Sequence, residues 1–274
     1  MNNLEKENFL ILGAGNMGIC FVKALIQNRI KANRIKIIEK NPSRELMVLK
    51  RKKKIEVFKD TKKVSTNINP SIVLLAVKPN QLSKALSSEF LKITKNSLII
   101  SIIAGKSLKE LKKVTKNSNC VRAMTNTPAS VGMGTSLVFY DRNTKQKNKK
   151  LSNNFLSLIG QVNETKSEKQ MDIFTAIFGG GPAYIYLFID VLTQISKKAK
   201  FKNSRNMVIQ TFLGSLLLLL SEKDEPVNLK KKVTSKGGTT ESALSILENN
   251  KGLNNLMQKA LKKAEQRSRE LNKI

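Results

Sequence analysis

The sequence has 274 residues, of which 40% are hydrophobic, and carries a formal net charge of +30. It contains no histidine, which excludes a Ser-His-Asp triad, a Cys-His pair and any histidine metal site. The two cysteines, Cys20 and Cys120, are far apart and form no CxxC motif. We therefore expect reduced thiols, a cytoplasmic location and no bound metal.

The positive charge comes from lysines that are dispersed along the chain rather than gathered on one segment. Only three tyrosines and no tryptophan are available to stack on bases. We therefore expect no specific nucleic-acid partner, although so basic a chain should attract anionic ligands.

The chain shows no pattern typical of a membrane protein. Residues 1–8 are polar and charged, so we expect no secretory signal in them. The longest apolar run, Phe212–Leu220, contains Gly214 and Ser215 and is shorter than the roughly 20 residues that span a bilayer. We expect a buried helix there, apolar enough to pack against a partner subunit, and no membrane association.

In the first part of the chain, short apolar runs alternate with helical patterns. This alternation predicts βαβ units and an α/β fold with a mainly parallel sheet, which binds ligands beyond the carboxyl ends of its strands. The predicted strands are Phe9–Leu12, Ile35–Ile38, Ile72–Val77, Leu98–Ile103, Cys120–Met124 and Thr135–Tyr140. The predicted helices between them are Asn16–Asn28, Pro79–Leu91 and Ser107–Val114.

The pattern changes near residue 164, after which apolar positions recur at helical spacing. No comparable strand pattern follows, so the sequence predicts a first domain at 1–164 and an all-helical domain at 165–274. The first helix of that domain carries Ile185, Leu187, Phe188, Val191, Leu192 and Ile195 on its apolar positions. Further helices are predicted at 204–222, 226–233, 239–249 and 251–272.

Residues 13–18 have the pattern GxGxxG, which follows a predicted strand and opens a predicted helix. In that context the pattern indicates a dinucleotide site. Gly13 permits the tight turn, Gly15 allows a pyrophosphate to approach the backbone, and Gly18 allows the helix to pack on the strand. The helix N-terminus adds free N–H groups and a partial positive charge.

Glu39 directly follows the second predicted strand, and the sequence around it gives two conflicting signals about the cofactor. An acid at this position hydrogen-bonds the adenosine ribose and favours NAD. Lys40 and Arg44 would instead hold a 2′-phosphate and favour NADP. From the sequence alone the cofactor is therefore NADPH or NADH.

Late in the chain, paired glycines and threonines stand just before a predicted helix, at Gly237–Thr240. Thr239 or Thr240 is expected to be the N-cap of that helix, and the free N–H groups there suit a carboxylate. A threonine hydroxyl can also hydrogen-bond an imine nitrogen. Taken without other motifs, the segment also fits a plain helix cap.

Together with the glycine turn, several motifs in order closely resemble the pyrroline-5-carboxylate reductase family, from about residue 9 to 270. They are Ala76–Pro79, Ser101–Gly105, Arg122–Ala129, Gly179–Tyr184 and Val233–Thr240. The resemblance implies an N-terminal Rossmann-type domain and a C-terminal helical dimerisation domain, which forms a homodimer or a ring of dimers. It also implies reduction of 1-pyrroline-5-carboxylate to L-proline with NADPH or NADH, the last step of proline biosynthesis, in a site partly built by the second subunit.

The resemblance also assigns residues to the site. It implies cofactor binding by Gly13, Gly15, Asn16, Met17, Gly18, Ala76, Val77, Lys78, Pro79, Ala104, Gly105, Asn126 and Thr127, and we add Lys40. It implies substrate binding by Ser235, Gly237, Gly238, Thr239 and Thr240. We expect Thr240 to be the catalytic residue, because its hydroxyl can hold or supply the proton of the imine nitrogen. A protonated imine is already electrophilic, so the absence of histidine is compatible with this reaction.

Some positions depart from the family pattern and keep alternatives open. Lys236 and Thr125 stand where the family usually has proline, and Phe178 and Gly180 stand where small hydroxyl residues are common. The alternatives are a reductase of another cyclic imine or of a small keto acid, and a non-catalytic nucleotide-binding paralogue.

Overall fold

The computed structural model describes residues 4–64 and 68–271, and it divides into two compact units. The sheet unit comprises Met1–Gly180 together with Ala264–Ile274, and the helical unit comprises Gly181–Lys263. Residue 272, the last of the predicted helix 251–272, lies outside the described residues. The boundary that we place at 164/165 from the sequence pattern stays a prediction.

The sheet unit is built on one eight-stranded sheet with the order β3-β2-β1-β4-β5-β6-β7-β8. Every neighbouring pair is parallel except β6 and β7, so the sheet is mainly parallel, as the sequence predicts. The strands are β1 Phe9–Leu12, β2 Ile35–Ile38, β3 Glu56–Phe58, β4 Ile72–Leu75, β5 Leu98–Ser101, β6 Cys120–Met124, β7 Gly134–Phe139 and β8 Gly160–Thr165.

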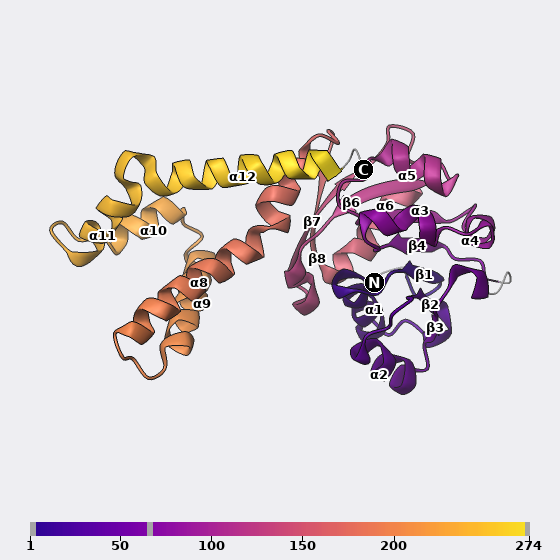
Figure 1. The fold of residues 1–274 in the computed structure, drawn as a ribbon, viewed down its shortest axis with the longest axis horizontal. Helices are drawn as coiled ribbons and strands as arrows, with labels where there is room; N and C mark the ends of the chain where they lie inside the picture. Colours follow the sequence, from indigo (N-terminus) through magenta and orange to yellow (C-terminus); the bar gives the residue numbers. More distant parts are fainter. Residues whose placement is uncertain (1–3, 65–67, 272–274) are drawn as a thin grey trace. The chain divides into compact units, whose positions relative to one another are not determined.

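Helices cover both faces of the sheet, because successive side chains of a buried strand point to opposite sides (Figure 1). Phe9 and Ile11 of β1 belong to one apolar cluster, and Leu10 and Leu12 belong to another. The helices of this unit are α1 Asn16–Gln27, α2 Arg44–Lys53, α3 Leu82–Ala85, α4 Ser88–Ile93, α5 Leu108–Thr115, α6 Gln146–Leu156 and α7 Gln170–Phe174.

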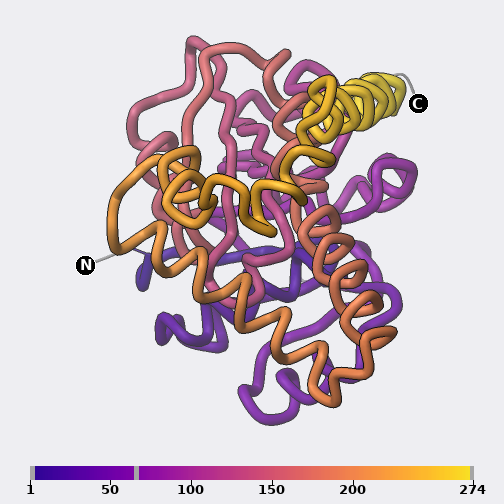
Figure 2. Tube along the Cα trace, turned by 90° about the vertical axis from the view of Figure 1, so that its left-hand side faces the viewer, coloured from indigo at the N-terminus to yellow at the C-terminus, as the bar shows by residue number. Residues whose placement is uncertain are grey.

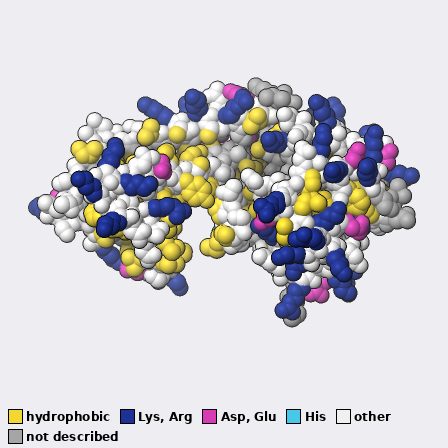
Figure 3. All heavy atoms as spheres, turned by 60° about the horizontal axis from the view of Figure 1, so that its bottom comes forward, with side chains coloured by type: hydrophobic (Ala, Val, Ile, Leu, Met, Phe, Trp, Pro, Cys, Tyr) yellow, Lys and Arg dark blue, Asp and Glu magenta, His cyan; other side chains and the backbone are white. Residues whose placement is uncertain are grey.

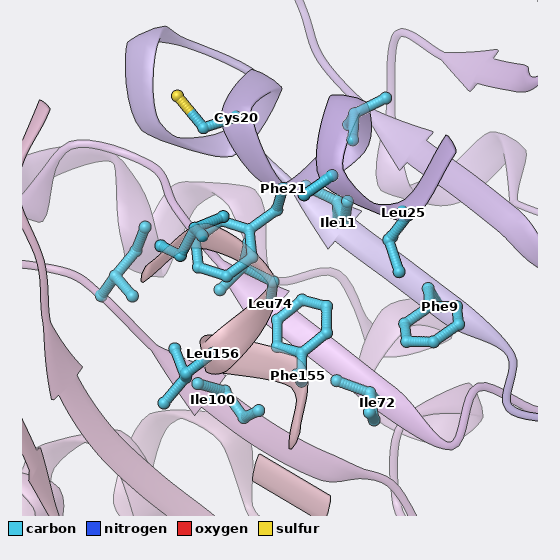
Figure 4. Packing of buried hydrophobic residues seen from close by; sticks show 14 of the residues in the cluster. Phe9, Ile11, Cys20, Phe21, Leu25, Ile72, Leu74, Ile100, Phe155 and Leu156 are labelled. Carbon is cyan, nitrogen blue, oxygen red and sulfur yellow. The ribbon is translucent and has the colours of Figure 1, made fainter. Parts of the chain in front are cut away.

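Aromatic stacking fixes α1 and α6 on the first face. The ring of Phe155 from α6 stacks on Phe21 of α1 at 4.9 Å between centroids and on Phe9 of β1 at 5.7 Å. All three rings are completely or almost completely buried, and Figure 4 shows them packed among the other side chains of the cluster. On the opposite face, Phe90 of α4 and Leu111 of α5 pack into the second cluster.

The predicted helix Pro79–Leu91 is wrong as one continuous helix. A 3-10 turn at Pro79–Gln81 leads into α3, and α4 starts separately. Leu86 has ψ 97°, which is extended backbone, and the Ser87 hydroxyl then accepts the N–H of Phe90 as the N-cap of α4. The break therefore follows from a serine that competes with the helix for backbone hydrogen bonds.

The helical unit contains no strand in residues 181–263, all of which the structure describes. Its helices are α8 Gly181–Lys198, α9 Ser204–Glu222, α10 Pro226–Lys232, α11 Thr239–Glu248 and the first part of α12 Gly252–Leu271. Residues 199–203 join α8 to α9, and the two helices pack as a pair (Figure 2). Few side chains are buried within them, so this unit has almost no core of its own.

Candidate active site

The glycine turn between β1 and α1 is shaped by close backbone packing. Gly13 has φ +92°, and a Cβ placed on it would lie 2.7 Å from the carbonyl oxygen of Ala76 and 2.9 Å from Cγ1 of Val77. A Cβ on Gly18 would lie 2.0 Å from the carbonyl oxygen of Gly13. These two glycines are therefore required by the fold, and they place the loop after β4 beside the turn.

Gly15 is different, because a Cβ placed on it would meet no atom within 4 Å. It is exposed and is the N-cap of α1, but no side chain caps the helix there. The first N–H groups of α1, at Asn16 and Met17, therefore have no side-chain cap, and they lie at the positive end of the helix dipole. This cradle fits the pyrophosphate of a dinucleotide.

Glu39 holds the glycine turn from the side of β2. One carboxylate oxygen accepts the N–H of Ala14 at 2.8 Å, and the other accepts the N–H of Asn41 at 3.0 Å. The neighbouring side chains of Lys40 and Arg44 are exposed and form no ion pair among the residues that the structure describes. The sequence suggested an acid near the ribose, but the bond to Ala14 depends on the turn geometry and could not be foreseen.

The loops after β4 and β5 lie at the same carboxyl edge of the sheet as the glycine turn. Lys78 is exposed and precedes the turn that begins at Pro79. Gly105, with φ +69°, packs instead on α12, since a Cβ on it would lie 2.7 Å from Cβ of Leu271. Gly105 is buried, so its observed contact is with the protein, and its predicted role in cofactor binding stays a prediction.

Asn126 positions the loop after β6. Its Oδ1 accepts the N–H of Thr135 at 2.9 Å, and its Nδ2 donates to the carbonyl oxygen of Phe178 at 3.1 Å. Phe178 belongs to a π-helical turn at Thr175–Gly179, a rare geometry that is common at functional sites. The amide therefore ties the start of the Thr127–Val131 turn to β7 and to the end of the sheet unit.

Thr125 directly precedes Asn126, and Ser136 lies on the neighbouring strand β7. The hydroxyls of both residues are buried without hydrogen-bond partners, a property shared only by Glu89 Oε2 among the described side chains. The two residues lie one step beyond the cross-strand pair Met124 and Leu137. A buried hydroxyl without a partner lowers the stability of the folded state. We therefore expect a local destabilisation where Thr125, after the end of β6, lies beside Ser136 of β7.

In the helical unit, the expected N-cap is wrong. Gly238, with φ −87° and ψ 171°, is the N-cap of α11, and Thr239 and Thr240 are its first two helical residues. The turn that brings Gly238 into this position is closed by its N–H, which donates to the carbonyl oxygen of Ser235 at 3.0 Å. Because glycine takes the cap, the two threonine hydroxyls are left free for another partner.

Both threonines are exposed, and neither hydroxyl makes a hydrogen bond within the part of the chain that the structure describes. Glu241, three residues after the N-cap, instead reaches back to accept the N–H of Gly237 at 2.7 Å. Gly237 has φ +73°, a conformation that favours glycine. The segment therefore presents two free hydroxyls and a helix N-terminus without a side-chain cap, which can bind an anion and a polar nitrogen.

Comparison with known proteins decides the family. The pyrroline-5-carboxylate reductase from Synechocystis is 31% identical over 265 residues, which cover 96% of this chain and 97% of the relative. The chain belongs to the pyrroline-5-carboxylate reductase family. The relative from Pasteurella multocida is 28% identical, with 99% of this chain and 100% of the relative covered.

Models of two protein families match separate parts of the chain. The model for pyrroline-5-carboxylate reductase dimerisation matches residues 168–271. The model for coenzyme F420-dependent NADP oxidoreductase matches residues 8–105, which contain the glycine turn.

Solved members of the reductase family have the same fold. The enzyme from Coxiella burnetii has a TM-score of 0.84 and 31% identity, covering 98% of this chain and 99% of that one. The enzyme from Plasmodium falciparum, solved with NADP bound, has a TM-score of 0.84 and 28% identity, with the same coverage of 98% and 99%.

The reductase family explains the exposed apolar helices of the helical unit. Leu216, Leu217 and Leu220 of α9 are 54%, 57% and 70% exposed, so the predicted burial of Phe212–Leu220 is wrong within the single chain. Figure 3 shows hydrophobic side chains gathered on the visible face of this unit, whereas lysines and arginines are spread over both units. The dimerisation match and this uncovered surface show that the chain is part of a homo-oligomer.

One helical stretch, Gln170–Lys198, is long and apolar enough to cross a membrane by length and composition alone. Only 11% of its most apolar window is buried. Its last part is α8, which lies within the dimerisation match, and an interface helix satisfies the same two criteria. The stretch is therefore weak support for a membrane protein.

Proposed function

We propose that the chain reduces 1-pyrroline-5-carboxylate to L-proline with NADPH or NADH. The observation that carries the proposal is the free Thr240 hydroxyl at the start of α11, which no side chain caps. The family comparisons support the same activity. The chain is thus an oxidoreductase, and the reduced nicotinamide supplies the hydride when the cofactor is bound.

The chain's own residues bind and orient the reactants. Gly15 and the N-terminus of α1 hold the pyrophosphate, while Gly13 and Gly18 keep the turn in shape. Ala76–Pro79 and Asn126–Thr127 are proposed to line the nicotinamide end of the cofactor. Fixing the imine carbon against the nicotinamide replaces a bimolecular encounter by a positioned one, which is the main contribution that the protein makes.

Substrate binding is assigned to the segment Ser235–Thr240. The carboxylate of the substrate accepts the free N–H groups at the start of α11, where the helix dipole also favours an anion. Gly237 and Gly238 allow close approach because they have no side chains, and Ser235 and Thr239 add hydroxyl donors. Thr240 is proposed to hydrogen-bond the ring nitrogen and hold its proton.

The proposal is tested by mixing the purified protein with NADH or NADPH and one of three substrates. These are 1-pyrroline-5-carboxylate, the six-membered piperideine carboxylate and a small keto acid. We expect rapid cofactor oxidation with the first and much slower oxidation with the others. Faster reaction with another substrate would assign that reaction instead, and cofactor binding without turnover of any of them would indicate a non-catalytic paralogue.

The assembly is proposed to be a homodimer, or a ring of such dimers, formed through α8 and α9. Leu217 of α9 is 57% exposed, and Leu217→Glu places a charge there that should lower the mass of the assembly in light scattering. Met47→Glu is the matched control, since Met47 is 45% exposed but lies on α2 of the sheet unit. Equal masses for both variants and the wild type would exclude this interface.

A cytoplasmic location is proposed on the state of the thiols. Cys20 and Cys120 are both free and buried. A chain without disulfides is typical of a reducing compartment. Fractionation of cells that produce the protein, with immunodetection in the soluble cytoplasmic fraction, tests this location.

A further inference from the structure

We propose that Glu39 makes the cofactor site of this chain selective for NADH over NADPH. The inference rests on the proposed NAD(P)H-dependent function and goes further by choosing between the two cofactors. The structural question is which charge acts at the adenosine ribose: the carboxylate of Glu39, or the cations of Lys40 and Arg44.

The position of Glu39 is set by the sheet. It directly follows β2, whose last residue, Ile38, pairs with Leu12 at the end of β1. The backbone around it is held on both sides, since Gly13 N–H donates to the Ile38 carbonyl at 2.9 Å and Glu39 N–H donates to the Phe58 carbonyl at 2.8 Å. Main-chain hydrogen bonds alone therefore hold the backbone of Glu39 beside the glycine turn.

The side chain is held as firmly as the backbone. Each carboxylate oxygen accepts one main-chain N–H, from Ala14 at 2.8 Å and from Asn41 at 3.0 Å. A carboxylate oxygen has two acceptor sites, so each keeps one free. The 2′- and 3′-hydroxyls of an adenosine ribose are donors and can use these free sites. A 2′-phosphate has no proton to donate at neutral pH and brings further negative charge to the same place.

The opposing cations are held much less firmly. Lys40 and Arg44 are exposed, and no acid pairs with either of them in residues 4–64 and 68–271. Exposed ion pairs contribute little, because water screens them and long side chains lose freedom when they form. A charge fixed by main-chain bonds and partly buried acts through a lower effective dielectric, so its repulsion is stronger. The repulsion by Glu39 therefore outweighs the attraction by Lys40 and Arg44, and the site favours the ribose diol over a 2′-phosphate.

The test uses fragments that carry the ribose but no nicotinamide. Isothermal titration with ADP-ribose and with 2′-phospho-ADP-ribose measures selectivity at this position without any imine or turnover. We expect the wild-type protein to bind ADP-ribose at least about tenfold more tightly, the ratio that corresponds to 1.4 kcal/mol. Tighter binding of the 2′-phosphorylated fragment, or equal binding of both, would overturn the proposal.

Substitutions identify the residue responsible. Glu39→Gln removes the charge while its amide oxygen can still accept the Ala14 N–H, and it should lose most of the tenfold preference. Glu45→Gln is the matched control, because it removes an acid from the first turn of α2 that pairs with Lys23 instead. An unchanged ratio in Glu39→Gln, or an equal loss in Glu45→Gln, would contradict the assignment.

Three further measurements keep the outcomes separate. Thermal unfolding of Glu39→Gln checks that the turn remains folded. If Glu39→Gln does not fold, Glu39→Asp replaces it in the titration, and this variant should keep the preference for ADP-ribose because it retains the charge. Double substitution of Lys40 and Arg44 by alanine should leave the preference for ADP-ribose over 2′-phospho-ADP-ribose in place, and loss of that preference would contradict the assignment to Glu39. If the protein binds ADP-ribose selectively but reduces no imine, the proposed activity fails while this inference stands.

Discussion

The hydroxyl of Ser268 donates a hydrogen bond of 2.8 Å to the carboxylate of Asp172, and this contact joins the end of α12 to α7. Asp172 Oδ1 also lies 3.9 Å from the guanidinium of Arg122 on β6, and that group bonds Glu168 at 3.0 Å. Glu168 in turn accepts the N–H of Leu108 at 2.6 Å. The network therefore ties the interior strand β6, the start of α5, α7 and the returning end of α12 together.

Ser268→Ala is expected to lower the free energy of unfolding by about 1–2 kcal/mol, because it removes a buried hydrogen bond to a charged group. Urea denaturation at a fixed protein concentration measures the change. Ser157→Ala is the matched control, since Ser157 is exposed and bonds only the carbonyl of Asn153 in the same helical turn. If both variants lose equal stability, the link between α12 and α7 is unimportant.

Thr125→Val and Ser136→Ala are expected to stabilise the protein. Each removes a buried hydroxyl that has no hydrogen-bond partner, which should raise the free energy of unfolding by about 1 kcal/mol. Thr115→Val provides the contrast, because the buried hydroxyl of Thr115 donates to the carbonyl of Leu111 at 2.7 Å. Denaturation should show a loss for Thr115→Val and a gain for the other two, and the reverse order would refute the argument.

Gly15→Ala is expected to leave the fold unchanged but to weaken dinucleotide binding by about tenfold or more. A Cβ there meets open space in the protein and would occupy the cradle for the pyrophosphate. Gly18→Ala is expected to unfold the turn itself, because its Cβ would lie 2.0 Å from the Gly13 carbonyl oxygen. Thermal unfolding and titration with ADP-ribose separate the two effects, and unaltered binding by Gly15→Ala would count against the cradle.

The two thiols are expected to be unreactive in the native protein. Burial raises the pKa of both Cys20 and Cys120, and this is offset only partly by the charge of Lys23 near Cys20 and by the hydrogen bond between Thr115 and Cys120. The nucleophilic thiolate is therefore scarce at pH 8. A chromogenic thiol reagent should react slowly with the native protein and rapidly with two groups per chain in guanidinium. Rapid reaction before unfolding would show that a thiol is accessible.

The raised pKa values of Cys20 and Cys120 make the free energy of unfolding depend on pH. Because the folded pKa is raised, the contribution of these thiols is fully present below the ordinary thiol pKa. It is lost as the pH rises through the raised value, since the unfolded chain ionises first. Denaturation at increasing alkaline pH should therefore show a decline that Cys120→Ala reduces.

The sheet could be predicted from the sequence where a strand is buried on both faces. Phe9–Leu12 is a continuous apolar run, whereas Ile35–Ile38 and Cys120–Met124 are each interrupted by one basic residue, Lys36 and Arg122. The structure confirms each of these strands with the predicted bounds. The edge strand β8 was missed because its residues are mostly polar and only Thr165 at its end is buried. The lysine-rich helix α2 was missed for a similar reason, since only Leu46 is buried in it.

The candidate site was predictable only in part. The glycine turn is found by its motif, because close packing leaves no room for a Cβ at Gly13 and Gly18. The N-cap of α11 could not be predicted from the sequence, because either a glycine or a threonine can take that position. The turn closed by the bond from Gly238 N–H to the Ser235 carbonyl decides between them. The bond from Ala14 to Glu39 joins residues 25 positions apart, and no local pattern reports such a contact.

The central claim is that the Thr240 hydroxyl hydrogen-bonds the imine nitrogen of the substrate. Its most direct test is the rate of 1-pyrroline-5-carboxylate reduction by Thr240→Ala and Thr240→Ser, with cofactor affinity measured in parallel. We predict that Thr240→Ala lowers kcat by about a hundredfold, that serine restores most of it, and that cofactor affinity stays unchanged. Wild-type kcat and KM in Thr240→Ala would contradict the claim.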